Sequence, residues 1–210
     1  MRSALSCNGV RVRYGGIEVL HGVRLALAYG TFSALVGPNG AGKTTLLDWL
    51  AGAANGSAEG DLWLDGVAAT RWPPARRARS GLRYVPFERN VFPGLSVLDN
   101  LRATAGAPDA AFAAFPELAR LAARSAGVLS GGERQLLAVA CALWGPGRIL
   151  LLDEPTHGLA PALVDRVLAR LADAAHGEDR SVLIAESQPV GTADFTWPLE
   201  RGLRLPAIGA

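Results

Sequence analysis

The fold of this 210-residue chain is decided by the stretch Gly37-Pro38-Asn39-Gly40-Ala41-Gly42-Lys43-Thr44-Thr45. In it, Gly37 and Gly42 are separated by four residues and are followed by Lys and Thr. The apolar run 31–36 before the stretch predicts a strand, and the spacing of apolar residues in 46–51 predicts a helix after it. A glycine turn between a strand and a helix points main-chain N–H groups at an anion, and the helix start adds its positive end. The stretch therefore predicts a phosphate-binding loop.

Two side chains of this loop carry the expected chemistry. Lys43 is the only lysine in the sequence, and every other permanently charged basic side chain is an arginine. A compact ammonium on a flexible stem suits the outer phosphates of a nucleotide, and the hydroxyl of Thr44 suits Mg²⁺. The residues expected to contact the phosphates are Gly37, Pro38, Asn39, Gly40, Ala41, Gly42, Lys43, Thr44 and Thr45.

A second motif closes a predicted buried strand. Residues 149–152 form a continuous apolar run that ends in Asp153 and Glu154. Ligands of open α/β sheets bind at the carboxyl ends of the strands. We expect Asp153 to hold Mg²⁺, directly or through water, and Glu154 to orient or deprotonate an attacking water.

The rest of the chain predicts an α/β arrangement around these motifs. Residues 5–14 and 17–27 alternate as two strands of a hairpin, and residues 52–60 are expected to be a loop. Tyr14, just before the hairpin turn, is compatible with a ring at the edge of a nucleotide pocket and equally with a half-buried strand aromatic. Helical patterns dominate from about 87 to 128, and Pro116 is expected to break one of these helices.

Composition limits the classes of function. Half of the residues are apolar and the net charge is +2, so a sizeable core is expected and no nucleic-acid partner. The run Arg76-Arg77-Ala78-Arg79 is expected to be a solvated helix face. Cys7 and Cys141 fit no metal spacing. No apolar run of 18 residues or more and no apolar signal region occur, so the expected compartment is the cytosol.

A third motif, Leu129-Ser130-Gly131-Gly132-Glu133-Arg134-Gln135, lies between the other two. With all three in this order, the chain resembles the nucleotide-binding subunit of an ATP-binding cassette (ABC) transporter over nearly all 210 residues. Residues 91–97, 158–161 and 199–202 are similar to the LivF-type subunit of branched-chain amino acid importers and to its urea-importer relatives. The resemblance implies a P-loop NTPase (RecA-like) α/β core with an N-terminal antiparallel β subdomain and an inserted short helical subdomain.

The resemblance also implies boundaries and partners. A single ABC ATPase domain, 1–210, is expected to consist of a nucleotide-binding core, 1–86 and 129–210, and a helical subdomain, 87–128. Two such subunits, identical or different, would close head to tail over ATP and Mg²⁺, so that the signature of one meets the ATP held by Lys43 of the other. The contacting signature residues would be Ser130, Gly131, Gly132 and Glu133, and Tyr14 would stack on adenine. The subunits would dock on transmembrane permeases at the inner face of the cell membrane and would serve a solute-binding protein indirectly.

Two positions depart from the family pattern. Phe87 stands where the family usually has Gln or Glu to reach Mg²⁺ and water, and Ser187 stands at the switch position that often holds His or Gln. We expect ATP binding with slow hydrolysis, either because a partner ATPase carries the competent site or because the subunit has diverged. The competing functions are a soluble ABC protein acting on nucleic acid or ribosomes and a non-hydrolysing nucleotide-binding regulator.

Overall fold

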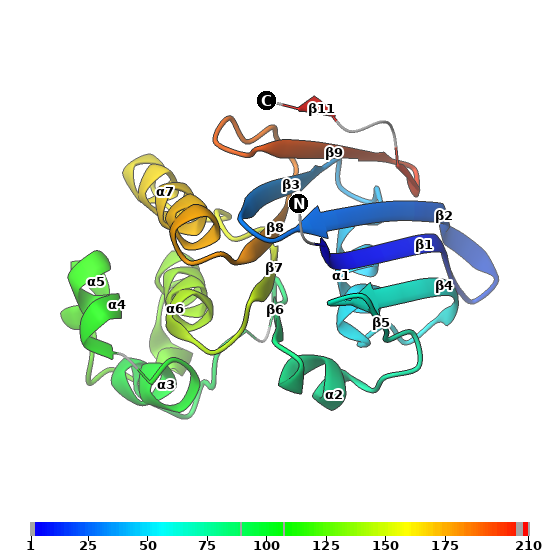
Figure 1. The fold of residues 1–210 in the computed structure, drawn as a ribbon. Coiled ribbons are helices and arrows are strands. Elements are labelled where there is room, and N and C mark those ends of the chain that lie inside the picture. The colour runs from blue at the N-terminus through cyan, green and yellow to red at the C-terminus, as the bar shows by residue number, and fades with distance from the viewer. Residues whose placement is uncertain (1–2, 89, 107, 205–207, 210) are drawn as a thin grey trace.

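The computed structural model describes residues 3–88, 90–106, 108–204 and 208–209, and its strands form two sheets (Figure 1). The smaller sheet is antiparallel, with strand order β2-β1-β4-β5. Its strands are β1 (Ser3–Tyr14), β2 (Ile17–Ala28), β4 (Ser57–Leu64) and β5 (Val67–Ala68). Buried and exposed residues alternate along much of β1 and β2, because successive side chains of a strand point to opposite faces. The predicted hairpin and antiparallel subdomain are therefore confirmed.

The larger sheet has the order β10-β9-β3-β8-β7-β6, and β11 pairs with β9. Its strands are β3 (Thr31–Val36), β6 (Leu82–Val85), β7 (Ile149–Asp153), β8 (Ser181–Glu186), β9 (Phe195–Glu200), β10 (Leu203–Arg204) and β11 (Ile208–Gly209). Strands β3, β8, β7 and β6 are parallel neighbours, so their carboxyl ends meet at one edge. The phosphate loop follows β3, Asp153 ends β7 with Glu154 directly after it, and Ser187 follows β8, so all of these lie at this edge.

Helices and the smaller sheet cover the two faces of the larger sheet (Figure 1). Leu150 and Leu152 of β7 pack with α6 (Gly131–Trp144) and α7 (Pro161–Gly177) in one core. Ile149 and Leu151 pack with α1 (Lys43–Ala51) and the antiparallel sheet in the other core. A strand that is buried on both faces does not alternate between apolar and polar residues, which is why residues 149–152 are all apolar.

The inserted helices lie beside α6, away from the antiparallel sheet (Figure 1). They are α3 (Val97–Thr104), α4 (Pro108–Ala114), α5 (Pro116–Ala119) and the 3₁₀ helix Ala126–Val128. Ser96 caps α3 by accepting a 3.0 Å hydrogen bond from the Asp99 main-chain N–H, and α4 and α5 are separate because Pro116 cannot continue a helix. The inserted helical part of the predicted fold is confirmed.

Two local predictions were wrong. Residues 52–60 are not all loop, because β4 already begins at Ser57 and pairs its small and acidic residues with β1. The arginine run is not a uniformly solvated face either, since Arg77 on α2 (Pro74–Arg79) is only 5% exposed. The Arg77 guanidinium donates hydrogen bonds of 2.6 and 2.8 Å to the carbonyls of Trp49 and Leu50, which end α1. The packing of α2 against α1 thus places Arg77 where it satisfies main-chain carbonyls at the carboxyl end of α1.

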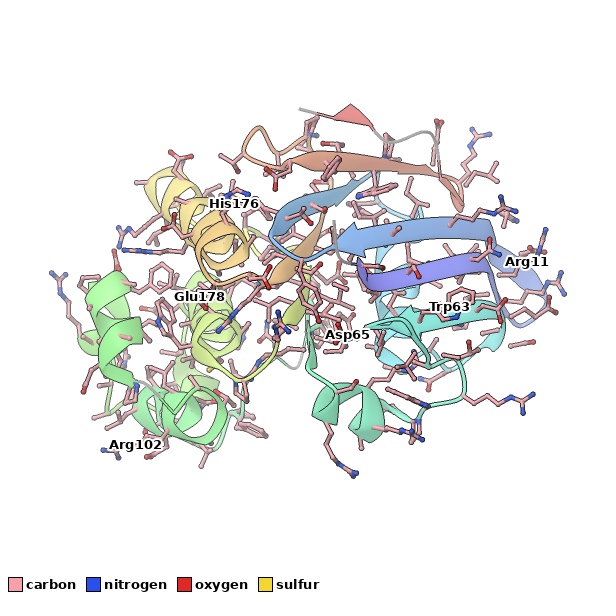
Figure 2. The ribbon with its side chains drawn as sticks, in the orientation of Figure 1. Arg11, Trp63, Asp65, Arg102, His176 and Glu178 are labelled. Atoms are coloured by element: carbon pink, nitrogen blue, oxygen red, sulfur yellow. The ribbon has the colours of Figure 1, made fainter. Side chains whose placement is uncertain are left out.

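Charged side chains mark the two ends of the molecule. Figure 2 shows Arg11 extending from the β1–β2 hairpin at one end and Arg102 extending from α3 at the other. None of the helices within the described ranges combines the length and the apolar character needed to cross a bilayer.

Candidate nucleotide-binding site

The predicted phosphate loop connects β3 to α1 and depends on two glycines. Gly42, the N-cap of α1, has a φ of 101°, which L side chains rarely adopt. A Cβ atom on Gly37 would collide with the carbonyl oxygen of Leu199 on β9. The loop is closed by a 3.1 Å hydrogen bond from the Ala41 N–H to the Pro38 carbonyl. The sequence context of strand, glycine turn and helix is therefore confirmed.

Lys43 lies inside this loop and is 5% exposed. Its Nζ donates hydrogen bonds to the carbonyls of Gly37 at 2.8 Å and Pro38 at 3.3 Å, and it lies 3.9 Å from Glu154 Oε1. A pocket of about 430 Å³ opens at this ammonium and is lined by Val19, Asn39, Gly40, Gly42, Lys43, Thr44, Thr45 and Glu154. The structure thus places most of the residues predicted to bind phosphate, together with Glu154, in the lining of one pocket.

Thr44 and Asp153 form the next layer of the site. Thr44 Oγ1 donates a 2.7 Å hydrogen bond to Asp153 Oδ2, whereas Asp153 Oδ1 is buried and accepts no hydrogen bond from the described residues. Burial raises the pKa of the Asp153 carboxyl, although the Thr44 hydrogen bond opposes this. A buried carboxylate oxygen without a donor is costly unless a cation occupies the place beside it.

This arrangement fits Mg²⁺. Mg²⁺ is commonly held by one or two protein oxygens together with substrate phosphates and water. Within the described ranges, no cluster of three or more His, Cys, Asp and Glu side chains is placed to hold a metal by itself. The hydroxyl of Thr44 and the open oxygen of Asp153 are two protein oxygens of the kind that Mg²⁺ takes.

Glu154 follows β7 in an unusual conformation. Its φ is 47°, which is rare for a residue other than glycine, and its N–H donates a 2.9 Å hydrogen bond to the Ala185 carbonyl on β8. Its carboxylate lies between two cationic or titratable groups, with Lys43 Nζ 3.9 Å from Oε1 and His157 Nδ1 3.5 Å from Oε2. The side chain lines the phosphate pocket, so it can contact a nucleotide or a water bound there.

Glu186 and Thr156 were missed by the sequence analysis. Glu186 Oε1 accepts hydrogen bonds from the Thr156 N–H at 3.1 Å and the Thr156 hydroxyl at 2.7 Å, and burial raises the pKa of the Glu186 carboxyl. This pair joins the end of β8 to the loop after Glu154. The only signal in the sequence was an acid at the end of a buried strand, and its partner, which lies 30 positions away, left none.

The signature motif begins α6 with a capping box. The Ser130 side chain accepts a 3.2 Å hydrogen bond from the Glu133 N–H, and Glu133 Oε2 accepts a 2.8 Å bond from the Ser130 N–H, which lowers the pKa of the Glu133 carboxyl. Gly131 and Gly132 line a different pocket of about 780 Å³ with Phe87, Gln135 and His157. Within one chain, the described residues of the signature and the phosphate loop therefore line separate pockets.

The remaining predicted residues lie outside the lining of the phosphate pocket. Tyr14 is half-buried at the end of β1 and packs against the antiparallel core, and Ser187 is exposed after β8. Phe87 is 39% exposed and packs edge-to-face on His157, with ring centroids 4.9 Å apart. The Phe87 side chain carries no polar atom. The functional roles of Tyr14 and Ser187 stay predictions.

The sequence profile of the ABC transporter family matches residues 20–157 of the chain, which include the phosphate loop, the signature and the acidic pair. The chain belongs to the ABC transporter family. As a member of this family, the protein binds ATP and hydrolyses it.

Relatives in three organisms support this assignment. The probable branched-chain amino acid transport ATP-binding protein LivF of Archaeoglobus fulgidus is 37% identical over 182 residues, which are 82% of this chain and 77% of LivF. BraG of Pseudomonas aeruginosa, a high-affinity branched-chain amino acid transport ATP-binding protein, is 34% identical over 94% of this chain and 89% of its own. The Fe(3+) ions import ATP-binding protein FbpC 2 of Rhodococcus jostii is 37% identical over 100% of this chain and 63% of its own.

Solved ABC cassettes share the fold of this ABC protein. A dimeric cassette in a post-hydrolysis state, bound to ADP and phosphate, superposes with a TM-score of 0.85 over 98% of each chain at 20% identity. The ADP conformation of another ABC transporter cassette gives 0.81 over 100% of this chain and 92% of its own, at 22% identity. The predicted fold class is thereby confirmed.

Proposed function

We propose that this ABC protein is the ATP-binding subunit of an importer for branched-chain or other small amino acids, or urea. The observation that carries the proposal is the convergence of Lys43, Thr44, Asp153 and Glu154 at one edge of the parallel sheet. The similarity to LivF and BraG over most of both chains supports amino acids as the solute class. The Fe(3+) import protein FbpC 2 is also similar over the whole chain, so the solute class is proposed and is not given by the similarity itself.

Each group in the pocket has a proposed task. Lys43 neutralises the outer phosphates of ATP, and the loop's main-chain N–H groups hold them. Thr44 and Asp153 hold Mg²⁺, which supplies charge neutralisation to the phosphates when bound. Glu154 orients the attacking water and accepts its proton, since its carboxylate lines the pocket beside Lys43.

A second ABC subunit would complete the site. The exposed residues Ser130 and Gly131 are separated from the phosphate pocket of their own chain, which supports a contact with ATP bound by another subunit. In this head-to-tail pair, Ser130, Gly131, Gly132 and Glu133 close over the γ-phosphate and Tyr14 stacks on adenine. The partner is a second copy or a different ABC ATPase.

Transmembrane permeases are the proposed membrane partners. We divide the single domain, 1–210, into a core, 1–86 and 129–210, and a helical subdomain, 87–128. Phe92 and Val128 are 54% and 66% exposed, and the 2.9 Å hydrogen bond from the Gly127 N–H to the Pro93 carbonyl joins their segments. Exposed apolar side chains on neighbouring segments favour a protein partner. The protein would then work in the cytoplasm at the inner face of the membrane, with a solute-binding protein as an indirect partner.

Uptake measurements test the proposed transport. In the source cell, the chain is replaced by Lys43→Ala, and the uptake of labelled leucine, valine, glutamate and urea is compared with that of the matched surface control Asn8→Ala. We expect Lys43→Ala to abolish the uptake of the branched-chain amino acids or of urea and Asn8→Ala to leave it unchanged. Normal uptake of all four solutes would contradict the proposal.

The second candidate function is a hydrolysis-impaired subunit in an asymmetric pair. Phe87 and Ser187 favour it, because neither can place a long polar side chain at the water or the γ-phosphate. One lost transition-state contact typically costs about 10²–10³ in rate. We expect the purified chain to bind Mg·ATP yet hydrolyse it slowly, and the double substitution Phe87→Gln and Ser187→His to raise kcat. Fast hydrolysis by the unmodified chain, together with no change on Ser187→Ala, would exclude this candidate.

A further inference from the structure

Two side-chain amides, those of Asn90 and Gln135, connect the segment 90–96 to Glu154. Gln135 on α6 is 5% exposed and lies between them. Its Nε2 donates a 3.1 Å hydrogen bond to the Glu154 carbonyl, and its Oε1 accepts a 2.9 Å hydrogen bond from Asn90 Nδ2. Because a carbonyl only accepts, the Gln135 NH₂ must face Glu154, which leaves Oε1 for the Asn90 donor. Both ends of the buried amide are therefore specified.

The main chain of Glu154 needs such support. A φ of 47° is unfavourable for glutamate and persists only where neighbouring groups hold it. The Glu154 N–H is held by the Ala185 carbonyl at 2.9 Å, and its carbonyl accepts from the His157 N–H at 3.1 Å and from Gln135. Among these three groups, Gln135 contributes a side chain, and it comes from α6, whereas Ala185 and His157 contribute main-chain groups. Its loss would let the Glu154 peptide, and with it the carboxylate, change direction.

The other end of the connection lies in a well-held loop. Asn100 on α3 is 0% exposed, accepts a 2.8 Å hydrogen bond from the Phe92 N–H and donates one of 3.0 Å to the Phe92 carbonyl. Asn90 precedes Phe92 by two residues and is also 3.3 Å from the Phe87 carbonyl.

We propose that Gln135 is a positioning residue for ATP hydrolysis, which holds the main chain of Glu154 and ties it to Asn90 of the segment 90–96. The inference rests on the role proposed for Glu154. This connection also gives the segment 90–96 a contact with Glu154 that needs no polar side chain at position 87, where the chain has Phe87.

Single-turnover hydrolysis of Mg·ATP by the purified full-length chain tests this inference. Gln135→Leu removes both hydrogen bonds, whereas Gln135→Glu keeps an acceptor for Asn90 and loses the donor to Glu154. Asn90→Ala removes the bond to Gln135 and the one to the Phe87 carbonyl but leaves the Gln135–Glu154 bond in place, and Asn8→Ala is the surface control. The affinity for ATP and the thermal midpoint are measured for every variant, so that positioning is separated from binding and from folding.

We expect Gln135→Leu and Gln135→Glu each to slow hydrolysis by about 10- to 100-fold, since small displacements of a catalytic group have effects of this size, while ATP affinity is unchanged. Asn90→Ala should slow it less, and combining Asn90→Ala with Gln135→Leu should be no worse than Gln135→Leu alone, because Asn90 acts through Gln135. Wild-type rates in both Gln135 variants, or additive losses in the double variant, would overturn the inference. If Gln135→Leu does not fold, Gln135→Glu replaces it in both comparisons.

The failure of the proposed function gives a different result. If Lys43→Ala and Glu154→Gln bind and hydrolyse ATP like the unmodified chain, the proposed ATP-binding and hydrolysis site is wrong. If those two variants lose binding and hydrolysis respectively but the Gln135 variants behave like the unmodified chain, only the role of Gln135 is wrong.

Discussion

Thr44 Oγ1 donates a 2.7 Å hydrogen bond to Asp153 Oδ2 across 109 positions of sequence, and the second oxygen of this carboxylate accepts none from the described residues. Thr44 lies in the first turn of α1, and Asp153 ends β7. Their contact joins the phosphate loop to the end of β7, and the proposed Mg²⁺ site uses the second oxygen of Asp153.

Thr44→Val should remove the Mg²⁺ dependence of nucleotide binding. The variant keeps the shape of the side chain and loses the hydroxyl, so Mg²⁺ would lose one of its two protein oxygens. We expect the affinity for ATP in Mg²⁺ to fall by about tenfold or more, in line with the loss of a hydrogen bond to a charged group, and the affinity in EDTA to stay the same. Titration with fluorescent ATP measures both, and the exposed Thr192→Val is the control. An equal loss with and without Mg²⁺ would contradict the assignment.

Lys43→Arg should be nearly as damaging as Lys43→Ala. The ammonium donates to two loop carbonyls in a buried position, where a planar guanidinium would not fit. We expect both variants to weaken ATP binding by about 100-fold or more, which corresponds to about 3 kcal/mol. Equilibrium titration gives the affinities. Normal binding by Lys43→Arg would show that charge alone suffices.

Glu186→Gln should stabilise the nucleotide-free protein increasingly as pH rises. Burial raises the pKa of Glu186 above that of the unfolded chain, so the folded state favours the protonated form. Below the unfolded pKa, the two proteins should be equally stable; as pH rises through the folded pKa, the wild type loses stability and Gln, which still accepts from Thr156, does not. Each 1 kcal/mol should appear as about 2–4 °C in the thermal midpoint.

Thermal unfolding from about pH 4 to about pH 8 measures this difference, and the exposed Glu59→Gln is the surface control. A difference between Glu186→Gln and the wild type that shrinks as pH rises would show that the buried carboxylate is favoured in its ionised form.

Lys43→Ala and Ser130→Arg should complement each other if the chain pairs with itself. Each variant would lose both sites of a head-to-tail dimer, but a mixed dimer keeps one site with an intact loop and an intact signature. Random mixing would then restore about a quarter of the wild-type ATPase rate, since half of the dimers are mixed and each has one site. The rate is measured before and after mixing at constant total protein. No gain on mixing would leave a different ABC ATPase as the partner.

Arg77→Ala should destabilise the protein strongly. The guanidinium donates to the carbonyls of Trp49, Leu50, Thr70 and Trp72, and the variant would leave these acceptors without it. Hydrogen bonds to a charged group contribute about 1.5–3 kcal/mol each, so we expect a loss of at least about 3 kcal/mol in the free energy of unfolding. Urea unfolding measures it, and the exposed Arg79→Ala is the matched control. Equal stability of the two variants would contradict the capping role.

The sequence by itself determined the features that consecutive residues encode. The phosphate loop could be predicted because Gly37, Gly42, Lys43 and Thr44 follow one another between a strand and a helix. The apolar run before Asp153 identified a strand buried on both faces. In each case the conformation depends on dihedral angles and burial within a few residues, which a local pattern expresses directly.

Only the tertiary structure decided which distant residues meet. The order β3-β8-β7-β6 brings Thr44 to Asp153 and Thr156 to Glu186, and the packing of α6 on the sheet brings Gln135 to Glu154. Arg77 resembled its exposed neighbours and is buried because α2 packs on the end of α1. These contacts depend on strand order and on burial between distant segments. Each contact joins two single polar residues, and a single residue produces no repeating pattern in the sequence.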